Sequence, residues 1–356
     1  MYVHSASVSL EVGSRSSMAT MVRCVDVELL ARVLPPLLLL ECMLGILGNS
    51  LALWIFCFHL KPWKSSTVFL FNLALADFLL NMGLPARVSY YLLGMDWRFG
   101  NASCTISLFL LALNRRGSIL FLMAIAVDRY VRVVHPHHPL NSMSLLKASC
   151  LSAGLWILNA SSNAHLLSRS HVFNSENSTL YRCESFTHND ELNRSMFILE
   201  FLLSLGIILF CSQRISGKLR ARQLDRTPRI CRVQRSLWVV TSMFIICFLP
   251  SNITRFLIWA RDAFAGGEGD CDSHKPLETA FYITICLTYL NSMLDPVVYY
   301  FINPSFKGIY RKLLKYILEK IRADQKDERA APAQGVEDNT NNDQLTTLES
   351  YLKNPV

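Results

Sequence analysis

Seven long blocks of apolar residues constrain this chain more than any other feature of its sequence. An apolar run of about 18 residues or more with few charges is long enough to cross a bilayer as a helix. The blocks span residues 33–58, 67–93, 104–134, 147–167, 196–216, 233–259 and 277–302. Only 17% of the residues are charged, against about 25% in soluble domains. The sequence therefore predicts an all-α membrane protein, a seven-transmembrane helix bundle.

Lysine and arginine residues are unevenly distributed among the connecting segments. Many lie between the fifth and sixth blocks and after the seventh, whereas segments 94–101 and 263–274 contain only Arg98. Positive residues stay in the cytoplasm when loops are short. We therefore expect a multi-pass plasma membrane protein with its N-terminus outside and its C-terminus inside. The net charge of +8 then reflects topology and not binding to nucleic acid.

The segments that this topology places outside contain cysteines and glycosylation sequons. Disulfides form in that oxidising compartment, and four cysteines are available there: Cys24, Cys104, Cys183 and Cys271. Three Asn-X-Ser/Thr sequons are also exposed to the glycosylation machinery: Asn101, Asn177 and Asn193. We expect both disulfides and glycans on this side of the membrane.

Polar residues also lie near the middle of several apolar blocks. A buried ionisable group costs at least a few kcal/mol in lipid, so its presence calls for a role. Hydrogen bonds between helices would account for amides and hydroxyls. Two carboxylates, Asp77 and Asp295, would instead repel each other in a low dielectric. A bound cation or a shared proton would relieve that repulsion, and we interpret the cluster as such a site.

One short motif marks each of six blocks, and the set appears in a fixed order. The motifs are Gly48-Asn49-Ser50, Leu73-Ala74-Leu75-Ala76-Asp77, Asp128-Arg129-Tyr130, Trp156, Cys247-Phe248-Leu249-Pro250 and Asp295-Pro296-Val297-Val298-Tyr299. This set resembles that of the rhodopsin-like G-protein-coupled receptors over about residues 33–320. Three positions depart from it, because Phe248 replaces tryptophan, Asp295 replaces asparagine and Ser204 replaces a proline. The last departure weakens inferences about the fifth helix.

The resemblance implies a role for several groups of residues. Cys104 would form a disulfide with Cys183. A sodium ion would be held by Asp77, Ser118, Asn291, Ser292 and Asp295. Activation and G-protein coupling would involve Asp128, Arg129, Tyr130, Phe248, Pro250, Asp295, Pro296 and Tyr299.

The resemblance and the composition together divide the chain into four parts. We predict an extracellular N-terminus over 1–32, a receptor domain over 33–302, an amphipathic eighth helix over 303–322 and a disordered cytoplasmic tail over 323–356. The eighth helix would lie along the membrane with Phe306, Leu313 and Leu314 toward lipid. The tail hydroxyls Thr346, Thr347 and Ser350 are candidate kinase targets for recruiting arrestin.

Arg115 is the residue of the third block that bears most directly on the ligand. It follows Cys104 by eleven residues, which is about 16 Å of helix. Arginine keeps its charge and offers a fork that fits a carboxylate. We therefore interpret it as the counter-ion of an anionic ligand, with a structural bridge to Asp77 as the alternative. Its neighbour Arg116 points about 100° away on the helix, toward lipid headgroups or another helix.

Other candidate ligand contacts lie on the second, third, sixth and seventh blocks. Leu111 shares a helix face with Arg115. Arg255 is either a second cation for the ligand or a boundary arginine that reaches water. Tyr91, Phe281 and Tyr289 could supply aromatic walls.

Longer stretches indicate a subfamily. Asn114-Arg115-Arg116-Gly117-Ser118, His135-Pro136-His137-His138 and Leu205-Gly206-Ile207-Ile208-Leu209 resemble the hydroxycarboxylic acid receptors, and the receptors for oxo- and hydroxy-eicosanoid acids are near relatives. The resemblance implies that Arg115 binds the ligand carboxylate. It adds contacts at Ser185, Phe186, Leu111, Arg255, Phe281 and Tyr289, and a disulfide between Cys24 and Cys271.

These features together predict a receptor and not an enzyme. The expected agonist is a hydroxycarboxylic acid, and the expected partner is an inhibitory heterotrimeric G protein (Gi) that lowers cyclic AMP. A hydroxy- or oxo-eicosanoid fatty acid is the alternative agonist. A transporter is the remote alternative, since inverted repeats and paired interrupted helices are not seen in the sequence.

Overall fold

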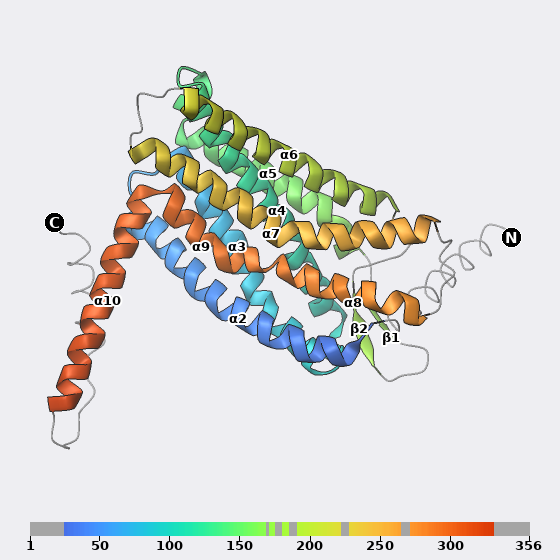
Figure 1. Cartoon of the computed structure of the whole chain (residues 1–356). Helices are drawn as coiled ribbons and strands as arrows, with labels where there is room; N and C mark the ends of the chain where they lie inside the picture. Colours follow the sequence, from blue (N-terminus) through green and yellow to red (C-terminus); the bar gives the residue numbers. More distant parts are fainter. Residues whose placement is uncertain are drawn as a thin grey trace.

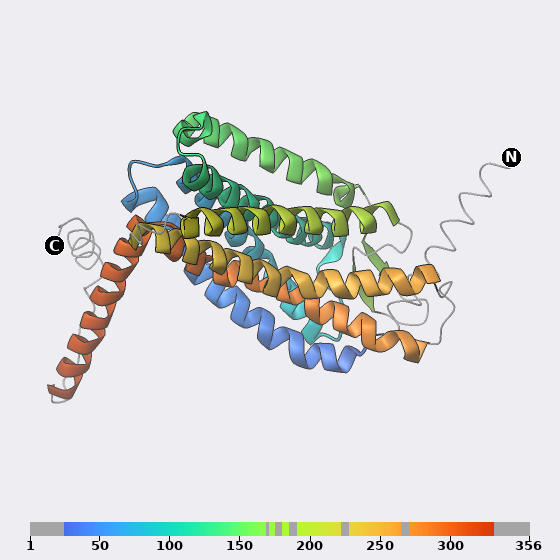
Figure 2. The same ribbon diagram turned by 45° about the horizontal axis from the view of Figure 1, so that its top comes forward.

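A bundle of long helices forms the body of the molecule (Figure 1). The computed structural model describes residues 25–168, 171–174, 180–184, 191–221, 228–264 and 271–330. The helices of the bundle are α2 (Val27–Trp54), α3 (Ser65–Leu92), α4 (Gly100–Val134), α5 (Leu145–Asn163), α6 (Glu191–Ala221), α7 (Pro228–Phe264), α8 (Cys271–Leu287) and α9 (Leu290–Ile302). A last helix, α10 (Pro304–Ala330), leaves one end of the bundle at a steep angle (Figures 1 and 2). We call this end the α10 end.

Short elements complete the described chain. A π-helical turn, η1 (Ile55–His59), ends α2, and 3-10 turns η2 (Pro139–Ser142) and η3 (Ala164–Leu167) flank α5. Strands β1 (Val172–Asn174) and β2 (Tyr181–Cys183) pair antiparallel with Val172 opposite Cys183. Their hairpin lies at the other end of the bundle, which we call the hairpin end (Figure 1).

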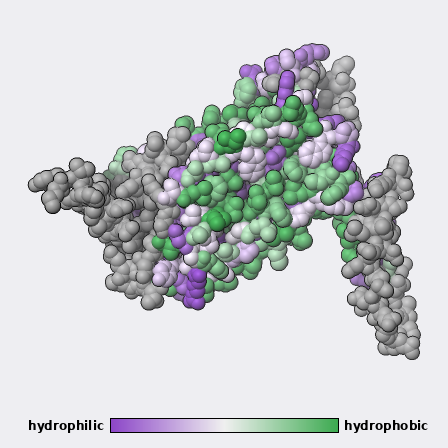
Figure 3. All heavy atoms as spheres, turned by 180° about the vertical axis from the view of Figure 1, so that it is seen from behind, coloured by the Kyte–Doolittle hydropathy of each residue, from purple (hydrophilic) through white to green (hydrophobic). Residues whose placement is uncertain are grey.

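The apolar blocks become helices because lipid offers no hydrogen-bond partners to the backbone, whereas a helix pairs its own N–H and C=O groups. Within the described residues, six helical segments are long and apolar enough to cross a membrane. The predicted fourth block corresponds to α5, which is shorter and packs against α3 and α4. Apolar residues cover much of the bundle between its polar ends (Figure 3). The predicted helix bundle is thus confirmed.

Several helix bounds differ from the sequence prediction, and α2 begins at Val27 instead of residue 33. The seventh block does not form one continuous helix, because α8 ends at Leu287 and α9 begins at Leu290. At this break the Thr288 hydroxyl donates to the carbonyl oxygen of Ile285 at 2.6 Å. This side-chain bond competes with backbone N–H groups for the same carbonyl oxygen. The predicted end of the eighth helix at residue 322 is also too early, since α10 continues to Ala330.

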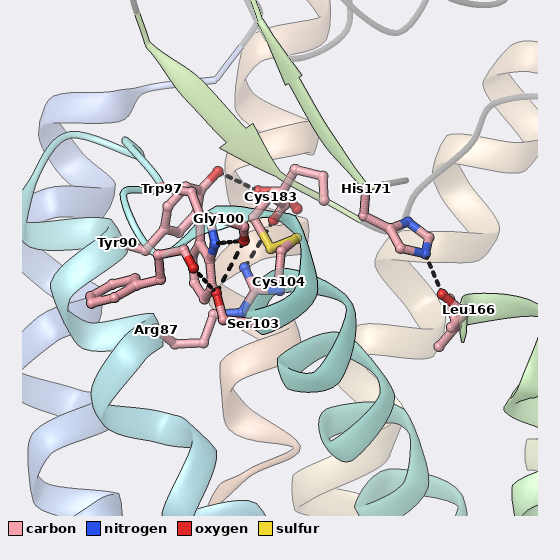
Figure 4. Close-up of a disulfide and its surroundings, with 11 residues drawn as sticks. Arg87, Tyr90, Trp97, Gly100, Ser103, Cys104, Leu166, His171 and Cys183 are labelled. Atoms are coloured by element: carbon pink, nitrogen blue, oxygen red, sulfur yellow. Dashed lines mark hydrogen bonds between the residues drawn. A yellow bond between two sulfur atoms is a disulfide. The ribbon is translucent and has the colours of Figure 1, made fainter. Parts of the chain in front are cut away.

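The hairpin is attached to the bundle by a disulfide and by backbone bonds (Figure 4). Cys183 on β2 and Cys104 on α4 form the disulfide, as the family resemblance implied. The Trp97 amide donates to the carbonyl oxygen of Tyr181 at 2.7 Å. These contacts hold the hairpin over the ends of α3 and α4.

Two glycines let α2 approach its neighbours closely. A Cβ atom at Gly45 would lie 2.5 Å from the Asn81 amide on α3. A Cβ atom at Gly48 would lie 2.7 Å from Cγ of Pro296 on α9. Real Cβ atoms do not come so near other heavy atoms, so only glycine fits the two positions.

Candidate functional site

A cavity opens among α2, α3, α4, α7 and α8 on the side of the bundle nearer the hairpin. It contains about 680 Å³ of empty space, including the part open to solvent. Its lining combines aliphatic side chains, three tyrosines, three arginines and one glutamate: Leu38, Arg87, Tyr91, Leu108, Leu111, Ala112, Arg115, Glu184, Arg255, Tyr282, Ile285 and Tyr289. Apolar walls with a few placed polar groups are typical of small-molecule sites.

Arg115 reaches the cavity from the middle of α4, and only 7% of the residue is exposed. Its Nη2 lies 3.4 Å from the Ser251 hydroxyl, which is on α7. The alternative bridge to Asp77 does not form, because the Asp77 carboxyl instead contacts Asn114, Ser118 and Tyr299. Arg115 is thus placed where a ligand carboxylate in the cavity could meet its guanidinium.

Four further predicted residues lie around Arg115. Leu111, Tyr91, Tyr289 and Arg255 all line the cavity. Phe281 stands beside it and supports Arg255, whose guanidinium lies 5.4 Å from the centre of the phenylalanine ring. Tyr289 occupies the break between α8 and α9, which allows a residue of the seventh block to turn into the cavity.

Two charged residues of the cavity were missed from the sequence. Arg87 on α3 is 6% exposed and donates to the carbonyl oxygen of Cys183 at 3.0 Å (Figure 4). Glu184 follows β2 and accepts a hydrogen bond from the Tyr90 hydroxyl at 2.7 Å. Burial raises the pKa of Glu184, while nearby Arg87 acts to lower it. An arginine inside an apolar block was a readable signal for Arg87, whereas Glu184 enters the cavity only through the fold of the hairpin.

A second cluster of buried polar groups lies deeper in the bundle and contains Asp77. One Asp77 oxygen accepts from the Asn114 amide at 3.0 Å and from the Ser118 hydroxyl at 3.5 Å. The other accepts from the Tyr299 hydroxyl at 3.2 Å. Ser292 also belongs here, since its hydroxyl lies 3.4 Å from the Asp77 carbonyl oxygen. The structure thus brings helices α3, α4 and α9 together at Asp77.

Asp295 is the second carboxyl of this cluster and interacts with Asp77. The Asn291 amide donates to Asp295 Oδ2 at 2.7 Å. Asp295 Oδ1 and Asn291 Oδ1 are buried and have no hydrogen-bond partner among the described residues. Unsatisfied oxygens beside two carboxyl groups suit a hard cation such as sodium, so the residues fit the ion that the resemblance implied.

A buried carboxyl in the first apolar block was also not anticipated. Glu41 on α2 is 1% exposed, and neither of its carboxyl oxygens has a hydrogen-bond partner among the described residues. It lies inside the first apolar block, one turn from Leu38 of the cavity lining.

At the α10 end, Asp128 and Arg129 do not pair with each other as their adjacency might suggest. Both oxygens of Asp128 accept from Arg132 Nε at 3.0 Å. Arg129 Nε is buried with no hydrogen-bond partner in the described part of the chain. The Tyr130 hydroxyl meets His135 Nε2 at 3.1 Å. Arg129 is therefore not tied to a carboxylate of its own motif.

Other predicted activation residues lie along α7 and α9. Phe248 is fully buried, and its ring centre lies 5.1 Å from that of Phe244. Pro250 lies within α7 and Pro296 within α9. Tyr299 links the polar cluster to α2, since its hydroxyl also donates to Asn49 at 3.2 Å.

Arg116 points away from the cavity, as its angle on the helix predicted, and finds a partner on a neighbouring helix. Its Nε donates to both carboxylate oxygens of Glu200 on α6 at 2.9 Å. Its Nη1 donates to Asn163 at the end of α5 at 3.2 Å. Of the two alternatives, contact with a neighbouring helix is the one observed.

Several predicted residues lie outside the described part of the chain. They are Ser185, Phe186, Cys24 and Asn177, and also the side chains of Cys271 and Asn193. Asn101 is described and exposed at the start of α4, as a glycan acceptor must be.

Comparison with known proteins identifies the class of this fold. Residues 48–299 match the family model described as 7 transmembrane receptor (rhodopsin family). The chain therefore belongs to the rhodopsin family of seven-transmembrane receptors. It is a G-protein-coupled receptor that crosses the membrane several times, and its relatives are receptors and not enzymes.

Individual relatives narrow this assignment. The human hydroxycarboxylic acid receptor 3 (Homo sapiens) is 49% identical over 82% of this chain and 76% of its own length. The mouse hydroxycarboxylic acid receptor 1 (Mus musculus) is 47% identical over 81% of this chain and 83% of its own length. The human oxoeicosanoid receptor 1 (Homo sapiens) is 42% identical over 81% of this chain and 73% of its own length. The subfamily is that of the hydroxycarboxylic acid receptors.

Proposed function

We propose that this receptor is activated by a carboxylic acid whose carboxylate binds Arg115, and that it then activates an inhibitory G protein (Gi) and lowers cyclic AMP. The observation that carries this proposal is a buried guanidinium at the wall of a largely apolar cavity. Arginine binds carboxylates in a forked geometry and keeps its charge when buried. A hydroxycarboxylic acid is the first candidate, because several relatives are named for that ligand.

A longer hydroxy- or oxo-eicosanoid acid is the second candidate, and one observation favours it. The cavity wall around Arg115 includes several aliphatic side chains, which suits a hydrocarbon chain. Leu38, Leu108 and Leu111 would then line the path of the hydrocarbon chain.

The proposed orientation places the hairpin end outside the cell. The disulfide between Cys104 and Cys183 suits an oxidising compartment. The basic residues of α10 lie at the other end. A ligand would then enter from outside, and a G protein would bind at the α10 end. Arrestin would bind there too, through tail residues outside the described part of the chain.

The proposed mechanism is a shift between two conformations. A carboxylate at Arg115 would reorganise the contact of this guanidinium with Ser251, and thereby the packing of α4 against α7. Fourteen residues, about 21 Å of helix, separate Arg115 from Arg129. Arg129 Nε makes no hydrogen bond among the described residues, and the nearby Asp128 is hydrogen-bonded to Arg132 instead, so Arg129 would be available when α7 moves.

Asp77 and Asp295, together with Ser118, Asn291 and Ser292, would hold a sodium ion within this mechanism. The single positive charge of this ion would offset part of the repulsion between the two carboxyl groups and so favour the packing seen here around Asn291 and Ser292. Because an agonist favours the other conformation, ion and agonist would oppose each other in binding.

The test is inhibition of stimulated cyclic AMP in cells that carry the wild type or Arg115→Ala. The acids would run from lactate and 3-hydroxybutyrate through octanoate derivatives to hydroxy-eicosanoids. Removing one partner of a buried charge pair costs about 2–5 kcal/mol, so potency should fall about 30-fold or more. The matched control is Arg32→Ala, since Arg32 is an exposed arginine on α2.

The two results of this test are clearly separated. A response to acids of one chain length that is lost in Arg115→Ala and kept in Arg32→Ala supports the proposal and selects between its two ligand classes. An undiminished response in Arg115→Ala, at equal surface expression, contradicts the assignment of Arg115.

A further inference from the structure

A second, smaller cavity lies among α4, α6 and α7 and shares one wall residue with the ligand cavity. We call it the side cavity, and its lining consists of Arg115, Arg116, Ile119, Glu200, Phe201 and Asn252. It has room for a group of about the size of one water molecule. Arg115 lines both cavities. A ligand whose carboxylate binds this guanidinium is therefore placed next to the side cavity.

Asn252 contributes a hydrogen-bond acceptor to the side cavity. The residue is only 5% exposed. Its Nδ2 donates to the carbonyl oxygen of Phe248, one turn earlier on α7, at 2.8 Å. This bond defines the orientation of the amide, because Oδ1 in the same place would face another acceptor. Oδ1 is buried and has no hydrogen-bond partner among the described residues. A buried acceptor without a partner is unfavourable, so a donor that reaches it stabilises the complex.

The remaining polar groups of the side cavity already interact with each other or with a neighbouring helix. Arg116 donates to both carboxylate oxygens of Glu200 and to Asn163. A carboxylate is too large for a space of this size, whereas a hydroxyl fits. A ketone oxygen also fits, but it can only accept a hydrogen bond, and so it would face Oδ1 of Asn252 as a second acceptor. The side cavity therefore favours a hydroxyl.

We propose that the side cavity binds the hydroxyl group of a hydroxycarboxylic acid, and that Oδ1 of Asn252 accepts its hydrogen while Arg115 binds the carboxylate. The proposal rests on the proposed role of Arg115. Asn252 then determines specificity for a hydroxy acid over the acid that lacks the hydroxyl and over the corresponding oxo acid.

The contact between α4 and α7 restricts where the hydroxyl lies on the ligand. Nη2 of Arg115 lies 3.4 Å from the Ser251 hydroxyl, and Asn252 is the next residue of α7. The Cα atoms of consecutive residues are about 3.8 Å apart. The two groups that bind the ligand are therefore neighbours. The hydroxyl is expected near the carboxylate and not at the far end of the hydrocarbon chain.

The experiment measures inhibition of stimulated cyclic AMP, and competition against the most potent acid in radiolabelled form. Each set of acids has a single carbon skeleton, of four or of eight carbons. The eight-carbon set contains octanoate, its 2-hydroxy, 3-hydroxy and 8-hydroxy derivatives, and the 2-oxo and 3-oxo acids. The readout is the potency of each derivative relative to the unsubstituted acid in the same receptor.

The variants isolate the contribution of the Asn252 amide. Asn252→Leu keeps the approximate size of the side chain and removes its polar atoms, and Asn252→Ser retains an oxygen that can accept from the ligand. The matched control is Thr254→Val. Thr254 also donates to a carbonyl oxygen one turn earlier on α7, that of Pro250 at 3.2 Å, and it lines neither cavity. Surface expression and the melting temperature show whether each variant folds, and Asn252→Ala replaces Asn252→Leu if the latter does not.

We expect the 2-hydroxy or the 3-hydroxy acid to exceed the unsubstituted acid by about ten- to hundredfold in wild type, which is the usual effect of satisfying a buried acceptor. This ratio should fall to about one in Asn252→Leu, recover in part in Asn252→Ser and stay at the wild-type value in Thr254→Val. The oxo acids and the 8-hydroxy acid should gain nothing over the unsubstituted acid.

Three results would overturn this inference. The first is a wild type in which a hydroxyl near the carboxylate brings no gain. The second is a gain that survives in Asn252→Leu, which would leave the side cavity as a site for water only. The third is an equal gain from the oxo acids. In each case responses that Arg115→Ala abolishes would still support the proposed function, whereas responses independent of Arg115 would reject both proposals.

Discussion

The ion pair between Arg116 and Glu200 offers the sharpest test of how the bundle is stabilised. Arg116 Nε lies 2.9 Å from both carboxylate oxygens of Glu200, and the two side chains are only 15% and 22% exposed. Removing one partner of a buried pair leaves an uncompensated charge and costs about 3–5 kcal/mol. Because these side chains are partly exposed, we expect about 3 kcal/mol for each single replacement, Arg116→Met or Glu200→Leu.

The double variant shows whether Arg116 and Glu200 stabilise the receptor through their interaction with each other. Replacing both partners of a buried pair by apolar residues is often neutral, so Arg116→Met with Glu200→Leu should recover at least half of what each single variant loses. Asn163 would then lose its contact with Arg116, a smaller cost of about 1 kcal/mol. The control is Arg32→Met, because the Arg32–Glu28 pair is exposed and such pairs contribute about 0–1 kcal/mol.

The assay is thermal unfolding of purified receptor in detergent, followed with a thiol-reactive dye. Unfolding would expose the buried thiols of Cys42, Cys211, Cys247 and Cys286, whereas the exposed Cys150 reacts in the folded receptor and sets the baseline. Singles as stable as wild type, or losses that simply add in the double variant, would refute the reasoning. An unfolding titration in denaturing detergent then gives the coupling free energy.

Two further predictions concern the polar cluster and the cavity. In wild type, replacing choline by sodium at constant ionic strength should lower agonist affinity by about fivefold or more. The variant Asp295→Asn should abolish this effect. A sodium effect of wild-type size in the variant would exclude Asp295 as a ligand of the ion. Glu184 should weaken acid binding as it ionises. Burial raises the pKa of Glu184, although the charges of Arg87 and Arg182 act to lower it. The neutral carboxyl therefore stabilises the folded receptor at pH 4.5 and below, and this contribution is lost as the pH rises through the raised pKa. Acid potency should therefore decline as the pH rises above 4.5 in wild type and stay flatter in Glu184→Gln. Equal slopes would assign the decline to another group.

The sequence was sufficient for the helices because lipid allows a long apolar segment few alternatives to a helix. It did not predict the break at Thr288, since a hydroxyl that competes for one backbone bond resembles any other threonine in the sequence. The length of α10 was also underestimated, because its last turns carry polar residues that suggested a disordered tail.

The candidate site was predicted in part, and the reason differs from residue to residue. Arg115, Arg255 and the aromatic residues could be placed near one another, because the motifs of the family fix the position of each residue along its helix. Arg87 and Glu41 meet the same criterion, an ionisable group within an apolar block, but neither belongs to a motif that indicates a role. Glu184 could not be found this way, because a disulfide and a hairpin bring it into the cavity.

The close approach of α2 to its neighbours also limits which changes evolution can make in this helix. At Gly45 and Gly48 even a methyl group would collide with Asn81 or Pro296. The opposite face of α2 contains Leu39, Leu40, Met43, Leu44 and Leu47, all exposed to the surroundings of the bundle. Sequence variation among orthologues should therefore concentrate on that face, where one apolar residue serves as well as another, and be nearly absent at the two glycines.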